Sequence, residues 1–304
     1  MRPLRIISSL IFAITVPFFI LLMLRAGKNI DNENDLTQGR WTRSSNVDWC
    51  EPNYIVTSHI AEFFNSMSSL IIVVSGMYGL YKHWNTVETR YLYAFTIITV
   101  VGLGSSLFHG TLMREWQLAD ELPMVWGNGI FIYCILTMED SPEWKHALVI
   151  KKKNNNYIYV LVGLEVISSF AITYLDSKDQ TIFLFCYSSG ALYIMYKNYQ
   201  LDFNHNRSHE IVFFDVSMIC YIGGLFVWLI DRLYCSSVVF GIIPIQKLHL
   251  HSFWHVFAGS GTYLCVLFWI WTRGKVLKRK GMTEEGSRML PMSQWISFDE
   301  VKIV

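Results

Sequence analysis

We expect an all-α fold, a multi-pass membrane bundle of seven helices with an additional N-terminal helix that resembles a signal anchor. The 304 residues are 52% hydrophobic and only 16% charged, with a mean hydropathy of +0.31. This is far more apolar than an average soluble domain. The apolar runs are about 20 residues long, the length of a helix that crosses a bilayer. They lack the strict alternation of strands, and helices satisfy every backbone group inside a membrane.

The first apolar run, residues 6–24, follows Met1-Arg-Pro-Leu-Arg5 and is long enough to span a membrane. A cleaved signal peptide and an uncleaved anchor share this pattern. The following Leu24-Arg-Ala-Gly-Lys28 lacks a convincing small-residue cleavage site, which favours the anchor. We therefore assign residues 1–28 to an anchor or signal segment and residues 29–59 to a lumenal linker.

Seven further apolar runs predict the helices of one domain, residues 60–273. They cover residues 60–81, 91–113, 118–138, 157–175, 181–196, 211–230 and 250–271. Lysine and arginine are concentrated in every second loop, and cation-rich loops face the cytosol. Both termini are therefore expected in the cytosol, with residues 274–304 as a polar cytosolic tail.

The formal net charge of +1 gives no basic field for phosphate, which argues against a nucleic-acid partner. No protein partner can be identified either. The six cysteines form no CxxC pair. Cys50 and Cys235 are expected on the lumenal side, and because that compartment is oxidising they are candidates for a disulfide.

A histidine pair begins the last apolar run. His251 and His255 are four residues apart and lie on one helical face, a spacing at which both can hold one metal ion. A solvated or core-satisfied pair is the alternative. The expected topology brings His109 and Asp120 to the same depth, and intramembrane ionisable groups usually mark a functional site. Three imidazoles with an open position are the ligand set of a catalytic zinc.

Five segments resemble the alkaline ceramidases, in the family's order. They are Val47-Asp-Trp-Cys-Glu-Pro-Asn-Tyr54, Ile60-Ala-Glu-Phe-Phe-Asn65, Gly104-Ser-Ser-Leu-Phe-His109, Gln117-Leu-Ala-Asp-Glu-Leu-Pro-Met124 and His251-Ser-Phe-Trp-His255-Val-Phe-Ala-Gly259. Members of the family are seven-helix membrane amidohydrolases of the endoplasmic reticulum and Golgi. They cleave ceramide to a sphingoid base and a fatty acid, and they share a superfamily with the adiponectin receptors. The run at residues 6–24 is not part of the family pattern.

The resemblance implies roles for five of these residues. His109, His251 and His255 would bind zinc, and zinc-bound water would be the nucleophile. Asp120 would act as general base and then general acid, and Ser105 could donate to the oxyanion. Two simpler interpretations stay open: Asp120 as a cap at a helix start, and Ser105 as a small residue that lets helices approach.

The resemblance also implies a calcium site in the segment before the first helix of the domain. Its ligands would be Asp48, the carbonyl of Trp49, Glu51, Asn53 and Glu62. Oxygen ligands suit calcium, whose role would be structural or regulatory. From the residues alone, a solvated acidic turn is the commoner explanation. The resemblance supports the Cys50–Cys235 disulfide as well.

These expectations describe a ceramidase that takes ceramide from the bilayer into an apolar cavity, with its active site toward the lumenal leaflet. The alternative is a seven-helix, zinc-containing lipid-sensing receptor of the same superfamily.

Overall fold

The computed structural model describes residues 39–140, 156–176, 180–205, 212–239 and 243–279. Seven long helices account for most of this part of the chain. They are α2 (Phe63–His83), α3 (Thr89–Thr111), α4 (Arg114–Leu136), α5 (Asn156–Tyr174), α6 (Thr181–His205), α7 (Val212–Tyr234) and α8 (Leu250–Arg279). A two-stranded ribbon, β1 (Val238–Val239) and β2 (Ile243–Pro244), and the short 3-10 helix η2 (Ile245–Leu248) lead into α8. The expected all-α class is confirmed, whereas the expected N-terminal helix lies outside the described residues.

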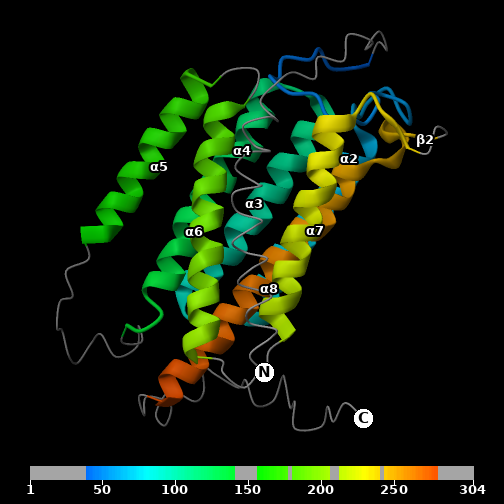
Figure 1. The fold of residues 1–304 in the computed structure, drawn as a ribbon. Helices are drawn as coiled ribbons and strands as arrows, with labels where there is room; N and C mark the ends of the chain where they lie inside the picture. Colours follow the sequence, from blue (N-terminus) through cyan, green and yellow to red (C-terminus); the bar gives the residue numbers. More distant parts are fainter. Residues whose placement is uncertain (1–38, 141–155, 177–179, 206–211, 240–242, 280–304) are drawn as a thin grey trace, which may run out of the picture.

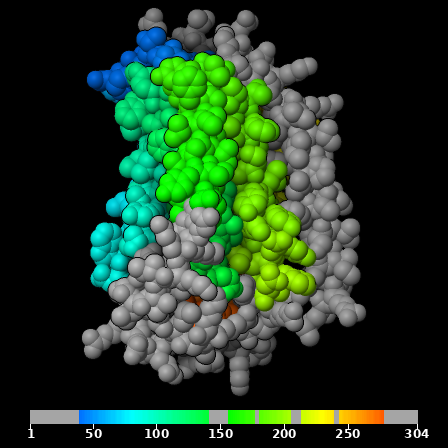
Figure 2. All heavy atoms as spheres, turned by 90° about the vertical axis from the view of Figure 1, so that its left-hand side faces the viewer, coloured from blue at the N-terminus to red at the C-terminus, as the bar shows by residue number. Residues whose placement is uncertain are grey.

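The helices run side by side along one common direction, with α5 at the edge of the bundle (Figure 1). Figure 2 shows α5 standing on the outer face beside α6. Ile172 is the only residue of α5 that is buried, and its apolar side chains, such as Val166 and Phe170, are largely exposed. A helix that exposes apolar side chains on most of its surface suits contact with lipid rather than water.

Five of the described helices are long and apolar enough to cross a membrane: α2, α3, α5, α7 and most of α8. The protein is therefore a membrane protein with several spans. α4 is equally long but carries four charged residues in its first two turns, from Arg114 to Glu121. Those residues belong to the part of α4 that contributes to the site described below.

Glycines let α2, α3 and α4 pack closely. A Cβ atom at Gly102 would lie 2.6 Å from the Val73 nitrogen of α2, and one at Gly104 would lie 2.1 Å from the Ala119 carbonyl oxygen of α4. Small residues at such contacts are typical of membrane helices. Pro123 has no N–H to donate to the carbonyl four residues earlier, so the Ala119 carbonyl at this contact lacks its usual donor within the helix.

Several helices are longer than the apolar runs that predicted them. α4 begins four residues earlier, at Arg114, and α6 continues nine residues beyond position 196, to His205. α8 continues through Gly274 to Arg279, past the boundary expected for the cytosolic tail. Hydropathy marks the stretch that fits the hydrocarbon core, whereas the backbone hydrogen bonds of a helix continue into polar sequence.

A buried ion cluster joins α3 and α8 at the end of the bundle remote from His109. Arg273 donates from Nε to Glu88 Oε2 and from Nη2 to Glu88 Oε1, both at 2.9 Å, and Arg90 also donates to Glu88. Burial alone would raise the pKa of Glu88, but the two guanidinium groups outweigh it and hold this pKa below its usual value. Arg273 also donates to the Met138 carbonyl at 2.7 Å, which ties in the chain after α4.

Candidate metal centre

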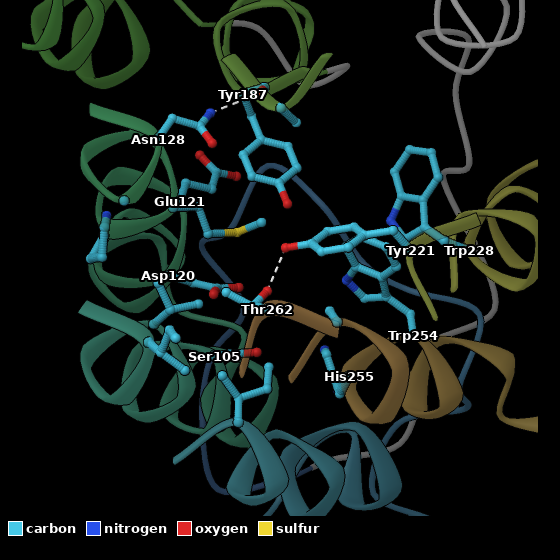
Figure 3. A pocket seen from close by; sticks show the side chains of 18 of the residues that line it. Ser105, Asp120, Glu121, Asn128, Tyr187, Tyr221, Trp228, Trp254, His255 and Thr262 are labelled. Atoms are coloured by element: carbon cyan, nitrogen blue, oxygen red, sulfur yellow. Dashed lines mark hydrogen bonds between the residues drawn. The ribbon is translucent and has the colours of Figure 1, made fainter. Parts of the chain in front are cut away.

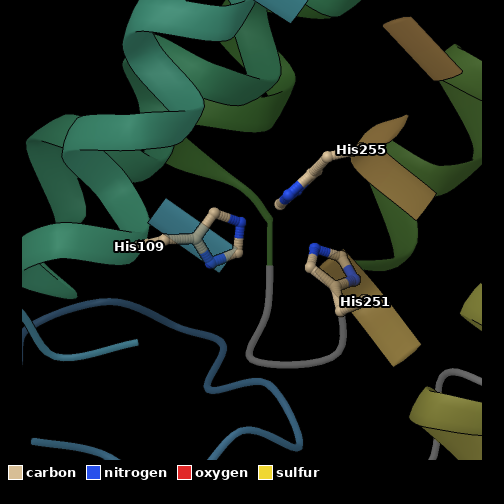
Figure 4. A group of neighbouring side chains, drawn as sticks. All are labelled: His109, His251 and His255. Carbon is tan, nitrogen blue, oxygen red and sulfur yellow. The ribbon is translucent and has the colours of Figure 1, made fainter. Parts of the chain in front are cut away.

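Three imidazoles from two helices meet in the bundle interior. His109 lies in the last turn of α3, and His251 and His255 lie in the first two turns of α8. One nitrogen of each ring lies within 4.8 Å of the others, and the three rings are at most 3% exposed. Figure 4 shows the rings facing a common centre. Within the described residues, this is the one group of three or more histidine, cysteine or acidic side chains that converges so closely.

The outward nitrogens of two rings already have protein partners. His109 Nδ1 is 2.5 Å from Glu62 Oε2, so it donates to that carboxylate and leaves Nε2 for the centre. His255 Nδ1 is 2.8 Å from Ser68 Oγ and 3.3 Å from Ser69 Oγ. Both rings are therefore held with one nitrogen engaged and the other turned inward.

His251 is held differently. Its ring stacks on the indole of Trp49, with centroids 3.8 Å apart and planes 20° apart, and its backbone N–H donates to Asp231 Oδ1 at 3.3 Å. Among the described residues, no group hydrogen-bonds to the buried Nδ1 of His251. The fit to a metal rests on the convergence itself, because one nitrogen from each of three buried rings lies within 4.8 Å of the others, a spacing at which all three can bind one ion. The three residues therefore fit a metal.

Ser105 and Asp120 face the same cavity as His251 and His255 (Figure 3). α3 ends at Thr111 and is capped by Leu112, whose backbone is left-handed (φ 52°), and α4 begins two residues after this cap. The close contact of Gly104 with Ala119 brings α3 and α4 together at this point, and the next residues, Ser105 and Asp120, both line the cavity. Asp120 is six residues inside α4, whose N-cap is Met113, so the interpretation of Asp120 as a helix cap is wrong.

Ser105 is more than a small packing residue. Gly104 makes the close helix contact, whereas the buried Ser105 hydroxyl lies 2.9 Å from Ser69 Oγ. Ser69 in turn donates to the Asn65 carbonyl at 2.8 Å. The Ser105 hydroxyl therefore belongs to the same hydrogen-bonded group as the partners of His255.

The cavity extends from the histidines into an apolar interior. Its wall on α8 runs from His251 to Cys265, and the ten residues from His255 to Cys265 span about 15 Å at 1.5 Å per residue. Most of the lining is aliphatic or aromatic, with few polar groups such as Tyr221, whose hydroxyl contacts Thr262. A polar end that carries chemistry and a long apolar remainder suit a lipid substrate.

The acidic segment before α2 is buried, so the interpretation as a solvated turn is wrong. Its five expected ligands are between 0% and 8% exposed: Asp48, Trp49, Glu51, Asn53 and Glu62. Burial raises the pKa of Asp48, of Glu51 and of Glu62 to about 7 each, and the charge of Glu62 adds to the effect at Asp48 and Glu51.

The carboxylates of this segment bind protein groups. Glu51 accepts the backbone N–H groups of Phe64 and Asn65, both at 2.8 Å, and so caps the start of α2. Glu62 Oε1 accepts the Trp49 N–H at 2.9 Å, and Asp48 pairs with Arg43 at 3.1 Å. In the described part of the chain, these carboxylates do not converge as the three imidazoles do.

The sequence profile of the ceramidase family matches residues 42–292. This chain belongs to the ceramidase family. It is 30% identical over 254 residues to alkaline ceramidase 3 of Mus musculus, an alignment that covers 79% of this chain and 89% of that protein. It is also 30% identical to alkaline ceramidase YPC1 of Saccharomyces cerevisiae, with 75% and 77% covered, and 30% identical to alkaline ceramidase 1 of Homo sapiens, with 70% and 77% covered.

The expected family is thereby confirmed, and with it a hydrolase of the alkaline ceramidase type. The matched segment contains the three histidines, Ser105 and Asp120, and it begins before the acidic turn. Residues 1–41 lie outside the match.

A disulfide joins Cys50 to Cys235 in this ceramidase, as expected. It fastens the acidic segment to the chain after α7, and Asp231 near the end of α7 also accepts the Cys50 N–H at 3.4 Å. Cys134, Cys186, Cys220 and Cys265 are free. Trp49, the residue before bridged Cys50, stacks on His251.

Three contributors to the ceramidase site were not identified from the sequence: Asn65, Ser68 and Asp231. Asn65 and Ser68 lie one turn apart on α2, and their spacing from Glu62 is the one signal that could have placed them on its face. Asp231 bonds the start of α8 only because α7 and α8 pack together, which no local pattern indicates.

Proposed function

We propose that this ceramidase hydrolyses the amide bond of ceramide drawn from the bilayer, using zinc held by His109, His251 and His255. Membership of the family supports ceramide hydrolysis. The observation that carries the zinc proposal is the convergence of three buried imidazoles at the polar end of an apolar cavity. The alternative of a lipid-sensing receptor is not favoured, because the relatives are named as ceramidases.

The donor set suits zinc, which takes three histidines and keeps a fourth position open in catalytic sites. When bound, zinc would lower the pKa of a coordinated water from about 15.7 to about 7, so that this water can act as the nucleophile, and it would polarise the amide carbonyl. Glu62 and Ser68 serve this centre by keeping the rings of His109 and His255 oriented.

Asp120 would move the proton. Its carboxylate accepts the proton of the attacking water and returns it to the departing amine nitrogen, so that one residue is base and then acid. Ser105 would donate its hydroxyl to the developing oxyanion. Because this hydroxyl contacts Ser69 in the resting structure, the donation requires Ser105 to turn from Ser69 toward the substrate.

The setting supports delivery from the membrane. Ceramide carries two hydrocarbon chains on a small polar amide, and the cavity offers a polar end beside an apolar channel of about 15 Å. We place the site toward the lumenal leaflet of the endoplasmic reticulum or Golgi, with both termini cytosolic. The disulfide is consistent with an oxidising compartment on that side. Residues 1–28 would form the anchor, and residues 29–59 the lumenal segment.

Calcium is a second proposed cofactor. Asp48, the Trp49 carbonyl, Glu51, Asn53 and Glu62 would hold it, and the buried carboxyl groups with raised pKa values support a need for positive charge there. Its role would be structural or regulatory rather than chemical, because Glu62 connects this segment to His109. Removal of calcium should therefore lower the thermal stability of the protein.

The test of the proposed function is ceramide hydrolysis by the purified full chain in detergent, with metal analysis of the same sample. We expect wild type to contain zinc and to release fatty acid. His255→Ala should lose both. Release of fatty acid that persists in this variant without zinc would contradict zinc chemistry.

A further inference from the structure

Asn65, in the first turn of α2, is fully buried and uses every one of its polar groups. Its main-chain N–H donates to Glu51 at 2.8 Å, and its Nδ2 donates to Glu62 Oε2 at 2.9 Å. Its Oδ1 accepts from Ser252 Oγ at 2.9 Å. Its carbonyl accepts from Ser68 and Ser69, at 3.0 and 2.8 Å.

These bonds determine which nitrogen of the His255 ring carries the hydrogen. A serine hydroxyl has one hydrogen, and Ser68 gives it to the Asn65 carbonyl. The oxygen of Ser68 must then accept from its other neighbour, His255 Nδ1, at 2.8 Å. His255 therefore carries its hydrogen on Nδ1, and its Nε2 is a bare lone pair.

Asn65 also orients His109, through Glu62. A carboxylate can only accept, so the Asn65 amide must turn its Nδ2 to Glu62 Oε2, and its Oδ1 then accepts from the Ser252 hydroxyl. That oxygen is the one that contacts His109 Nδ1. With Glu62 ionised, this oxygen can only accept, so His109 also carries its hydrogen on Nδ1.

We propose that Asn65 is a positioning residue of the metal centre, which fixes His109 through Glu62 and His255 through Ser68, so that both rings present Nε2 to the metal. α2 contributes no ligand to the centre, yet it orients ligands from both α3 and α8. This inference rests on the proposed metal site.

Serines on α2 provide a matched test. Ser68→Ala removes the acceptor of His255 Nδ1. Ser66→Ala removes a hydroxyl of the same helix that donates to the Ser106 carbonyl at 2.8 Å and, within the described part of the chain, hydrogen-bonds to no histidine. Asn65→Asp replaces the donor to Glu62 by an acceptor while keeping the oxygen that faces Ser252. Ser68→Thr keeps the hydroxyl and serves as the rescue variant.

The first readout is the zinc dissociation constant of the purified full chain, measured by competition with a chromogenic chelator. Loss of such an outer partner typically weakens metal binding about 10- to 100-fold. We expect that range for Asn65→Asp, and about 10-fold for Ser68→Ala because Ser69 still lies 3.3 Å from His255 Nδ1. Ser66→Ala and Ser68→Thr should bind zinc like wild type.

The second readout is the visible absorption of the cobalt-substituted protein, which reports the ligand field rather than stability. Its bands should shift in Ser68→Ala and Asn65→Asp but not in Ser66→Ala. Equal loss of zinc affinity in Ser66→Ala and Ser68→Ala, or wild-type affinity and spectra in Ser68→Ala and Asn65→Asp, would overturn the positioning role alone. Absence of zinc binding by wild type would instead overturn the proposed centre, and this inference with it. If Asn65→Asp does not fold, the zinc affinity and the cobalt spectrum of Ser68→Ala alone test the positioning role.

Discussion

Each of the three imidazoles is held by a different kind of contact. His109 has a carboxylate, His255 has a serine hydroxyl, and His251 has an indole face and a backbone bond to Asp231. These partners come from segments far apart in the sequence, so they could not be predicted from local spacing. The ligands themselves could be predicted, because the four-residue spacing of His251 and His255 and the shared depth of His109 depend only on helix geometry and topology.

At the residue scale, Asp120→Asn should separate chemistry from metal binding. The amide cannot accept the water proton, so the turnover number should fall about 100- to 10,000-fold while the zinc content stays that of wild type. Steady-state kinetics and metal analysis on one preparation measure both. Glu115→Gln is the matched control, because Glu115 is exposed in the first turn of the same helix. Loss of zinc together with activity in Asp120→Asn would argue against its role as a base.

At the scale of elements, hydropathy predicts that each helix exists but not where it ends. The extensions of α6 and α8 are polar, and Arg273 near the end of α8 is buried because it pairs with Glu88. For the acidic segment before α2, the sequence predicts the wrong burial. Its charges are typical of a solvated turn, but the disulfide and the contact of Trp49 with His251 bury it, and both depend on tertiary packing.

The start of α2 depends on Glu51, which accepts two backbone N–H groups, one with each oxygen. Glutamine has a single acceptor oxygen, so Glu51→Gln leaves one of these buried donors unpaired. Loss of a helix cap costs about 0.5–2 kcal/mol, and we expect Glu51→Gln to lower the thermal midpoint accordingly. Thermal unfolding of the purified variant measures this. A midpoint equal to that of wild type would show that the cap is dispensable.

The cluster of Glu88, Arg90 and Arg273 predicts a dependence of stability on pH. The pKa of Glu88 is lower in the folded protein than its ordinary value of 4.5. The contribution of ionised Glu88 to the stability of the fold is therefore fully present above about pH 4.5 and is lost as the pH falls through the folded-state pKa. Glu88→Gln lacks this contribution, so the difference in thermal midpoint between wild type and Glu88→Gln should shrink as the pH falls below about 4.5. A difference in thermal midpoint that stays constant as the pH falls would show that the charge of Glu88 does not stabilise the fold.

At the scale of the whole molecule, the bundle places a polar centre at one end of a long apolar cavity. Cys265 lines that cavity about 15 Å along α8 from His255. A larger side chain there should shorten the space for hydrocarbon chains without reaching the histidines. We expect Cys265→Phe to reduce hydrolysis of long-chain ceramides much more than that of short-chain ceramides. The ratio of kcat/KM for the two substrates measures this, and an unchanged ratio would show that the lipid chains do not occupy this part of the cavity.

The central claim is that His109 of α3 joins His251 and His255 of α8 around one zinc ion. X-ray absorption at the zinc edge of the purified protein tests it most directly. We predict three imidazole nitrogens at about 2.0–2.1 Å in wild type, and two, with much weaker binding, in His109→Ala. Zinc that is absent from wild type, or whose ligand shell is the same in His109→Ala, would contradict the account.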